Sequence, residues 1–437
     1  MSPPSAFSVV LSLRRVDMRT SAAAPRDART CTRTFVHRAS NARRPRARAP
    51  SASTTRGGFQ ADERVDVVVV GAGVIGLACA RELSRRGMRV FVADRAPAVG
   101  LGTSARNSEV LHAGMHYAPG SLKADFCVRG RRMIVDYCEK KDVRWDNIGK
   151  IIVASEESQM DDLEAMIERA MRNDVDDLEL LSAESLREYE KNVRGFAGVW
   201  SPSTSVVDTR ELMESFRRDC VRDGRTSISL GDEVVEITPA GRAMYRVKTK
   251  SKVIAAPRIV NAAGLHAHRV CERMTEVYDQ IATPPPPLYF ARGLYCTLKK
   301  GAGAPFQRLV YPLPRHGGLG VHFTKDVFGN CKFGPDIEWI DEIDYTIKPE
   351  RVSAFYDAIR EYWPELPDGF LRTAYTGIRP KLINETGDED EPGATTDFMI
   401  QTEVDHRASG VVHLFGFESP GLTSAMCVAE RVCELLE

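Results

Sequence analysis

The sequence lacks a cysteine framework. Its ten Cys are scattered along 437 residues, and no two of them form a Cys-x-x-Cys pair. Neither a zinc ribbon nor a secreted disulfide scaffold is therefore indicated. Long apolar runs are also lacking, since the longest, residues 67–80, includes three Gly and is shorter than the roughly 18 residues of a membrane-spanning helix. No transmembrane helix is expected, and peripheral contact with a membrane stays open.

Net charge is also absent, but the balance of 60 basic and 60 acidic side chains conceals an asymmetry. Residues 1–56 hold twelve Arg and no Lys or Glu, and only Asp17 and Asp27 oppose them. The remaining chain is therefore acidic by ten charges. Because phosphate contacts need clustered Lys and Arg, such a body excludes a general nucleic-acid binder.

The segment 1–56 is rich in Arg and poor in acids, and contains many Ser, Thr, Ala and Pro. This composition is typical of an organellar transit peptide, and no apolar stretch is long enough for a secretory signal. The alternative is a basic tail that stays attached and disordered. Arginine enrichment favours a mitochondrion, with a plastid as the second choice.

A nucleotide-binding pattern follows this segment. Residues 66–70 form a β-branched run, as expected for a parallel strand buried on both faces. A Gly-x-Gly-x-x-Gly turn comes next, then helical apolar spacing at 77–83, then a second strand at 88–93 that ends at Asp94. Strand, glycines, helix, strand and acid in this order predict dinucleotide binding rather than a merely structural glycine turn.

Each residue of this pattern has a physical role. Gly71 permits a tight turn, Gly73 lets a pyrophosphate approach the backbone, and Gly76 lets helix and strand pack closely. The N–H groups at the start of the helix attract phosphates. Asp94 can accept hydrogen bonds from ribose hydroxyls, and an acid there argues against NADP. The local pattern does not separate FAD from NAD.

Further segments resemble one family. Thr-Ser-Ala-Arg-Asn-Ser-Glu-Val-Leu-His-Ala-Gly at 103–114 is similar to the flavin-loop signature of L-2-hydroxyglutarate dehydrogenases, members of the FAD-dependent D-amino-acid-oxidase (DAO) superfamily. Gly-Phe-Glu-Ser-Pro-Gly-Leu-Thr at 416–423 resembles a closing motif of the same family. The other matching segments, in chain order, are 119–124, 149–154, 260–265, 311–314, 319–323, 334–335 and 377–381.

The resemblance implies an α/β fold, α+β overall, in which a Rossmann-like FAD-binding domain is interleaved with a substrate domain built on a mixed, mainly antiparallel β-sheet. At 437 residues, about two domains are also expected from length. The FAD-binding domain is expected at 62–148, 205–275 and 371–437, and the substrate domain at 149–204 and 276–370. Strands are expected at 319–323 and 411–415, and helices at 208–224 and 419–436.

The expected cofactor is FAD, and no metal site is expected. His266 and His268 are two residues apart on a probable helix, so they point to different faces and cannot easily share a metal. The residues expected to bind FAD are Gly71, Gly73, Gly76, Asp94, Thr103, Ser104, Asn107, Ser108, Val234, Ala263, Gly264, Gly416, Ser419, Gly421, Leu422 and Thr423.

The resemblance implies oxidation of L-2-hydroxyglutarate, or a related small 2-hydroxy acid, to the 2-oxo acid. His112 is the expected base, because a neutral imidazole suits proton abstraction; the alternative is a structural His. Arg379 is the expected carboxylate clamp, because a guanidinium matches two carboxylate oxygens; the alternative is a salt bridge between domains. Three residues could recognise the distal carboxylate without a ranking among them: Tyr311, Lys123 and Arg292.

Electrons are expected to pass to a quinone or an electron carrier. Two other functions stay open: an amino-acid or sarcosine-type oxidase, and a non-catalytic flavoprotein that assists assembly of a respiratory complex. His112 and Arg379 together favour an enzyme, because an assembly factor needs neither a base nor a clamp.

Overall fold

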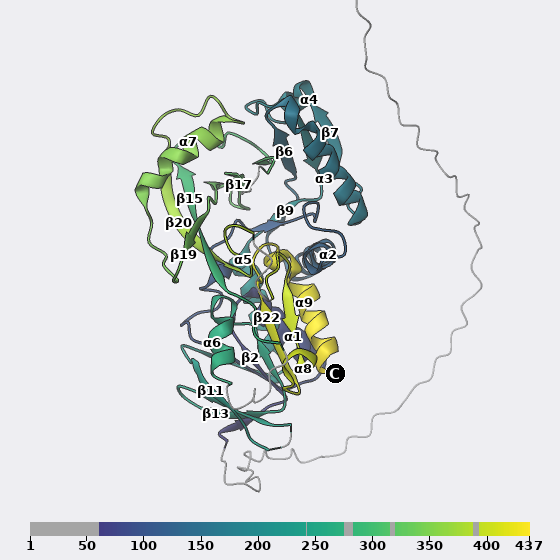
Figure 1. Ribbon diagram of the computed structural model, residues 1–437, viewed down its shortest axis with the longest axis vertical. Helices are drawn as coiled ribbons and strands as arrows, with labels where there is room; N and C mark the ends of the chain where they lie inside the picture. The colour runs from purple at the N-terminus through teal and green to yellow at the C-terminus, as the bar shows by residue number, and fades with distance from the viewer. Residues whose placement is uncertain (1–60, 242, 275–282, 315–319, 388–392) are drawn as a thin grey trace, which may run out of the picture. The chain divides into compact units, whose positions relative to one another are not determined.

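A computed structural model describes residues 61–241, 243–274, 283–314, 320–387 and 393–437. The predicted transit peptide, residues 1–56, lies outside the described residues. The described chain is a mixed α/β structure, which confirms the expected fold class. Figure 1 shows helices lying against several sheets, and two of these sheets position the site.

A six-stranded sheet forms around the predicted nucleotide-binding strand. All neighbouring strands in it are parallel except β21, which is antiparallel to β22. Their order across the sheet is β10 (Thr226–Leu230), β3 (Val90–Asp94), β2 (Val67–Val70), β14 (Ile259–Asn261), β22 (Val411–Phe415) and β21 (Met399–Gln401).

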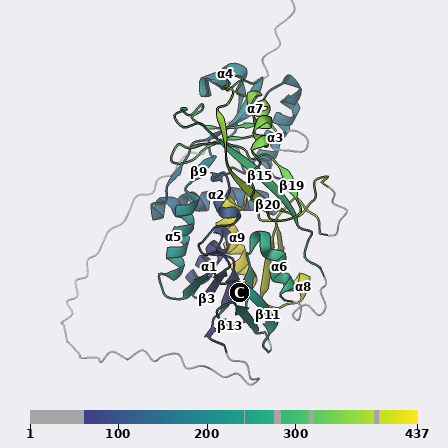
Figure 2. The same ribbon diagram turned by 90° about the vertical axis from the view of Figure 1, so that its left-hand side faces the viewer.

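Alternation along β2 divides the core on the two faces of this sheet. Val67 and Val69 pack against the helices, and Val68 and Val70 pack against a second sheet on the opposite face. Continuous Val is therefore what this strand requires, because both of its faces are buried. The helices on the first face are α1 (Val74–Arg85), α2 (Leu122–Lys141), α5 (Thr209–Val221) and α9 (Gly421–Leu436), of which α1, α5 and α9 are seen together in Figure 2.

The second sheet has four strands and lies beside the short helix α6 (Ala267–Glu272). Its order is β1 (Glu63–Arg64), β13 (Val253–Ala256), β12 (Tyr245–Thr249) and β11 (Val234–Pro239). A small three-stranded sheet joins β4 (Val110–Leu111), β9 (Ser205–Val207) and β5 (Trp145–Asp146).

A nine-stranded, mainly antiparallel sheet carries the other side of the site. One inner pair, β16 and β6, is parallel. The strand order is β19 (Glu338–Ile340), β15 (Tyr289–Leu298), β18 (Cys331–Phe333), β17 (Phe323–Lys325), β16 (Leu309–Pro312), β6 (Lys150–Ala154), β8 (Ala197–Ser201) and β7 (Glu179–Ser182), with β20 (Leu371–Lys381) paired to β15.

The remaining elements are short. They are α3 (Met160–Arg172), α4 (Ala183–Tyr189), α7 (Val352–Arg360), α8 (Glu403–His406), and the 3₁₀ turns Thr103–Ala105, Glu157–Gln159, Gly264–His266 and Pro349–Arg351. The strand at 411–415 lies where the sequence predicts it, and the helices α5 and α9 occupy their expected places with ends shifted by at most three residues.

The expected strand at 319–323 is wrong in its placement. Residue 319 lies outside the described residues, residues 320–322 join no ladder, and the strand begins only at Phe323, opposite Val310. The cause is a close approach: a side-chain carbon on Gly320 would lie 2.5 Å from Pro312, and Gly320 has a positive φ of 69°. An alternating apolar pattern does not reveal such an approach.

The interleaving of segments differs in one detail from the boundaries expected above. The six-stranded sheet draws on 67–94, 226–261 and 399–415, whereas β20, placed with the FAD-binding segments, pairs with β15 in the nine-stranded sheet. The domain boundaries themselves stay a prediction.

Candidate active site

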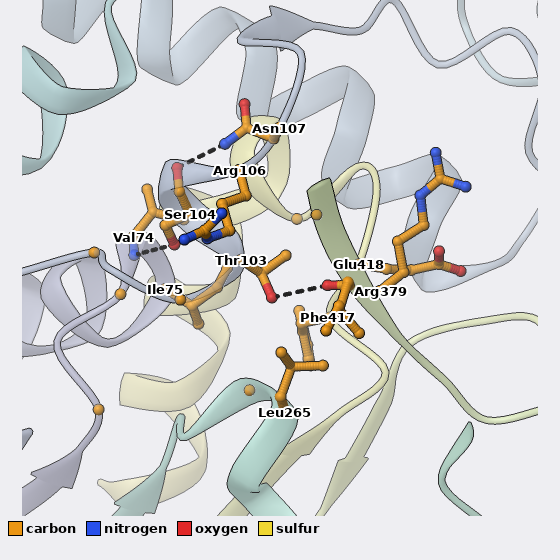
Figure 3. Close-up of a pocket in the computed structure, with 18 of the residues that line it drawn as sticks. Val74, Ile75, Thr103, Ser104, Arg106, Asn107, Leu265, Arg379, Phe417 and Glu418 are labelled. Carbon is orange, nitrogen blue, oxygen red and sulfur yellow. Dashed lines mark hydrogen bonds between the residues drawn. The ribbon is translucent and has the colours of Figure 1, made fainter. Parts of the chain in front are cut away.

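A cavity of about 650 Å³ extends from the turn after β2 to β20 of the nine-stranded sheet. Figure 3 shows Val74 and Ser104 on one side of it, with Arg379 and Glu418 on the other. Of the residues predicted to act or to bind FAD, only Gly76 and Gly416 do not line the cavity. Those that do are Gly71, Gly73, Asp94, Thr103, Ser104, Asn107, Ser108, His112, Val234, Ala263, Gly264, Arg379, Ser419, Gly421, Leu422 and Thr423.

The glycines after β2 create an open backbone edge. Gly71 has φ 109°, and a side chain there would meet the Ala262 carbonyl at 2.5 Å. A side chain on Gly76 would lie 1.9 Å from the Gly71 carbonyl oxygen, which explains why this glycine packs behind the cavity rather than lining it. At Gly73 the nearest atom would be Ser104 Oγ at 3.2 Å, so the backbone there borders the cavity.

Asp94 closes the same turn. Its Oδ2 accepts a hydrogen bond from Ala72 N at 2.6 Å, and its Oδ1 accepts one from Ala96 N at 2.8 Å. Each carboxylate oxygen keeps a further lone pair for another donor. Asp94 thus orients the glycine turn and still borders the cavity.

The segment 103–108 joins α1 to β20. Ser104 Oγ accepts from Val74 N at 3.0 Å, at the first residue of a helix that has no capping side chain of its own. Thr103 Oγ1 donates to the Ile378 carbonyl at 3.1 Å, and Asn107 Nδ2 donates to Ser104 O at 2.6 Å (Figure 3). These hydrogen bonds fix the position of the start of α1 relative to β20, the strand that carries Arg379.

The N-terminus of α9 holds His112 from the other side. Thr423 Oγ1 accepts from His112 N at 3.1 Å and lies 3.3 Å from the Val110 carbonyl, to which it can donate. Ser419 Oγ lies 3.4 Å from His112 Nε2. Gly416 lies outside the cavity lining, because its outer side faces Leu382. Two residues that lie more than 300 positions from His112 in the chain therefore hold it: Ser419 contacts its ring, and Thr423 contacts its backbone.

His112 is held neutral by its surroundings. Burial lowers its pKa well below the ordinary value of 6.5, and the charges of Lys150, His322 and Arg379 act in the same direction. A neutral imidazole at neutral pH has one nitrogen able to accept a proton.

Arg379 presents a guanidinium to the cavity from β20. Among the described residues, no carboxylate lies within ion-pair distance of it. Its acidic neighbour Glu418 is bound instead by Lys123 at 3.0 Å and Lys381 at 2.7 Å. Burial raises the pKa of Glu418, but these two lysines and Arg379 outweigh it and bring that pKa to about 2.

The three residues that could recognise the distal carboxylate of the substrate differ in whether they line the cavity. Lys123 is buried against Glu418, and Arg292 is bound by Glu338 and Asp344, so both cations already have carboxylate partners, and neither cation lines the cavity. Tyr311 lines the cavity. Its ring stacks on His322 at 3.6 Å between centroids, and His322 also lines the cavity although nothing in its sequence context indicated it.

A metal role finds no support among the described residues. His266 Nε2 lies 3.1 Å from Arg95 Nη1, and His268 Nε2 lies 2.7 Å from the Pro286 carbonyl, so the two rings have different partners. Within the described ranges, no group of three or more His, Cys, Asp or Glu side chains could hold an ion.

The cavity fits an elongated dinucleotide cofactor. The Gly73 backbone borders it, its length reaches from Asp94 to Arg379, and the first turns of α1 and α9 both open onto it. The half that holds Arg379, His112 and Tyr311 can bind an anionic substrate and accept its proton.

Comparisons with known proteins agree with this geometry. The family model described as FAD dependent oxidoreductase (DAO) matches residues 66–435. The chain is 38% identical to "L-2-hydroxyglutarate dehydrogenase, mitochondrial" of Arabidopsis thaliana, over 85% of this chain and 83% of that protein. It is 28% identical to a glycerol 3-phosphate dehydrogenase of Caloramator mitchellensis, over 85% and 74%. Among solved structures, L-alpha-glycerophosphate oxidase of Mycoplasma pneumoniae with FAD bound has a TM-score of 0.76 at 24% identity, over 86% of this chain and 95% of that one.

Proposed function

The chain belongs to the family of FAD-dependent oxidoreductases, and we propose that it oxidises L-2-hydroxyglutarate, or a closely related 2-hydroxy acid, to the 2-oxo acid. The observation that carries the proposal is one cavity holding both Arg379, which pairs with no carboxylate among the described residues, and a neutral histidine, His112. The relatives named above as L-2-hydroxyglutarate dehydrogenases support the choice of substrate.

The residues divide the reaction between them. Arg379 binds the carboxylate next to the reacting carbon through two parallel N–H donors. His112 takes the hydroxyl proton as the C–H bond breaks, and Ser419 and Thr423 hold its ring and its backbone in place. FAD, when bound, supplies the acceptor for the hydride. The substrate loses one hydride and one proton and becomes the 2-oxo acid.

Other functions receive less support. An assembly factor has no use for a base and a guanidinium that together line one cavity, and the curated relatives reported above are named as dehydrogenases of hydroxy compounds. The amino-acid oxidase reading rests on fold similarity alone.

Anaerobic mixing tests the function directly. The FAD-loaded enzyme is mixed with L-2-hydroxyglutarate, its D-enantiomer, glycine or sarcosine, and the flavin absorbance is followed. We expect bleaching with the L-hydroxy acid and formation of one 2-oxoglutarate per flavin. Bleaching by glycine or sarcosine alone would replace the proposal with an oxidase, and no bleaching by any of them would favour the assembly factor.

The proposal also covers the electron acceptor, contact with a membrane and the location of the protein in the cell. We expect a quinone or an electron carrier to reoxidise the flavin, with peripheral membrane contact near the acceptor. In the described ranges, no helix is both long and apolar enough to cross a bilayer. Residues 1–56 are proposed as a mitochondrial transit peptide, as the mitochondrial relatives suggest. A fluorescent fusion of these residues tests this proposal, and import into plastids would contradict it.

A further inference from the structure

One buried cation near the cavity, Lys150, has no counter-charge among the described residues. Of the Lys and Arg side chains that the structure describes, Lys123, Lys150 and Arg292 are buried. Lys123 and Arg292 each have carboxylate partners, whereas no described carboxylate lies within ion-pair distance of Lys150, which is only 1% exposed. A buried charge without a partner is costly, so an anion that arrives later would be favoured there.

Lys150 lies directly behind a ring of the cavity wall. It begins β6, and β6 pairs in parallel with β16, which carries Tyr311. The Lys150 ammonium lies 5.0 Å from the centre of the Tyr311 ring. Lys150 itself does not line the cavity, but Tyr311, His322 and His112 do. Its charge therefore reaches the cavity across the aromatic ring.

The tip of Tyr311 offers a donor to an anion. Burial raises the pKa of its phenol above the ordinary value, so the hydroxyl stays protonated. No described residue forms a hydrogen bond with this hydroxyl. The other titratable groups that act on Tyr311 are Tyr295 and Arg379, and Cys127 acts on Lys150; none of the three is a carboxylate. Lys150 in turn acts on His112 and His116.

Arg379 can satisfy one carboxylate of a substrate, and the Lys150 charge remains for another. We propose that Tyr311 and Lys150 together receive the second carboxylate of a dicarboxylic 2-hydroxy acid, Tyr311 through its hydroxyl and Lys150 through its charge behind the ring. Lys150 is thus a specificity-determining residue, which selects dicarboxylates over monocarboxylates. This inference rests on the proposed function, because it assigns the distal end of the same substrate.

The test compares two substrates that differ only at the tail. L-2-hydroxyglutarate carries a distal carboxylate, and L-2-hydroxypentanoate carries a methyl group on the same carbon skeleton. In Lys150→Met we expect the ratio of their kcat/KM values to fall by about ten- to a hundredfold, the worth of a charge-assisted contact. Assays at pH 7 keep His112 neutral, because its pKa lies well below 6.5, and keep the wild-type Lys150 protonated, because its pKa is about 8. An effect on the base therefore does not enter the ratio.

Two further variants make the result specific. Lys299→Met is the matched control, because Lys299 is an exposed lysine that lies 5.9 Å from the ring centre of Phe370 in the same sheet region; its ratio should stay at the wild-type value. Tyr311→Phe keeps the ring beside Lys150 but removes the donor, and should also lower the ratio. Equal losses for both substrates in Lys150→Met and Tyr311→Phe would overturn the inference.

A binding measurement separates this inference from the proposed function. Glutarate and pentanoate are titrated into the FAD-loaded protein, and the flavin spectrum reports binding without turnover. Glutarate should bind more tightly than pentanoate in the wild type, and Lys150→Met should remove the difference. If no 2-hydroxy acid reduces the flavin but this preference holds, the proposed reaction fails and the anion subsite stands. Equal binding of the two acids by the wild type would overturn the subsite.

Discussion

At the scale of single residues, the chemistry depends on which charges near the cavity are compensated. Glu418 is bound by two lysines, whereas Arg379 has no described carboxylate partner. The guanidinium therefore stays available to a ligand, and His112 beside it stays neutral. Because Arg379 is proposed to bind the substrate and His112 to take its proton, substitution of each residue should affect a different step.

His112→Ala should abolish rapid reduction of the flavin while FAD stays bound. A general base contributes about 10² to 10⁴ in rate, and the backbone contact of His112 with Thr423 does not need the ring. Stopped-flow absorbance under anaerobic conditions measures the effect. His116→Ala is the neighbouring control and should reduce at a rate within about threefold of wild type. Near-normal reduction in His112→Ala would exclude His112 as the base.

The pH profile follows from the same residue. The base must be neutral, and the pKa of His112 lies well below 6.5, because of burial first and of the cations around it second. On the acid side of the profile, kcat/KM should therefore stay level down to pH 6.5 and fall only at lower pH. Lys150→Met removes one of these cations, so the fall should begin at a higher pH than in the wild type. A wild-type midpoint above 7 would contradict the described environment.

Arg379→Lys should weaken substrate binding more than it slows the chemical step. One point charge replaces two parallel donors, at a cost of about 1.5–3 kcal/mol for a lost hydrogen bond to a charged group, or roughly a ten- to hundredfold rise in KM. Steady-state kinetics with an artificial electron acceptor measures it. An unchanged KM would show that Arg379 does not bind the carboxylate.

At the scale of elements, Gly73 in the turn between β2 and α1 and Gly76 in the first turn of α1 have different roles. A side chain on Gly76 would overlap the Gly71 carbonyl at 1.9 Å, within the protein itself. A side chain on Gly73 meets only Ser104 Oγ, at 3.2 Å. Gly73→Val should therefore fold and lose FAD, whereas Gly76→Val should lose folded protein. Circular dichroism and the ratio of flavin to protein absorbance distinguish them. A yellow Gly73→Val protein would contradict the assignment of this turn to the pyrophosphate.

Elements of this kind could be predicted because their signals are local. The Val run of β2, the glycine spacing and Asp94 lie within 28 consecutive residues, and each has a short-range physical cause. The segment 320–322 has the same alternating composition as a strand, but Gly320 approaches Pro312 and the ladder begins only at Phe323. The pattern of a strand does not specify its partner, so the error arises from a contact outside the pattern.

The site was only partly predictable for the same reason. His112 and Arg379 stand in recognisable motifs, but whether Arg379 is free depends on Lys123 and Lys381 binding Glu418. Lys150 and His322 carried no signal, because their roles come from the pairing of β6 with β16 and from the approach of residue 322 to Tyr311. Long-range pairing decides which charges are left without partners.

At the scale of the whole molecule, the cavity exists only when distant segments have folded together. His112 follows β4, Lys150 begins β6, Arg379 lies on β20, and Thr423 lies in the first turn of α9. The cavity walls come from different sheets, so retention of FAD reports the completeness of the fold. The fold also holds the buried Lys150 charge, which we propose for a ligand carboxylate. When that ligand is absent, this charge should lower the free energy of unfolding.

Lys150→Met should accordingly stabilise the protein. Burial lowers the pKa of Lys150 from 10.5 to about 8, against a smaller opposite effect of Cys127. Between these values the unfolded chain binds more protons, so the free energy of unfolding rises with pH across this window; below pH 8 the full cost of about 3 kcal/mol applies. Loss of the cation–π contact with Tyr311 offsets about 0.5–2 kcal/mol of the gain.

The measurement is the thermal midpoint of the FAD-loaded enzyme at pH 7, followed by the release of flavin fluorescence. The thermal midpoint of Lys150→Met should be higher than that of the wild type, and the midpoint of Lys299→Met should equal the wild-type value. Saturating glutarate should reduce the difference in thermal midpoint between Lys150→Met and the wild type. The reason is that a bound carboxylate compensates the Lys150 ammonium, which only the wild type has. A lower midpoint in Lys150→Met would mean that the ammonium already has a stabilising partner, and the dicarboxylate subsite would then lose its physical basis.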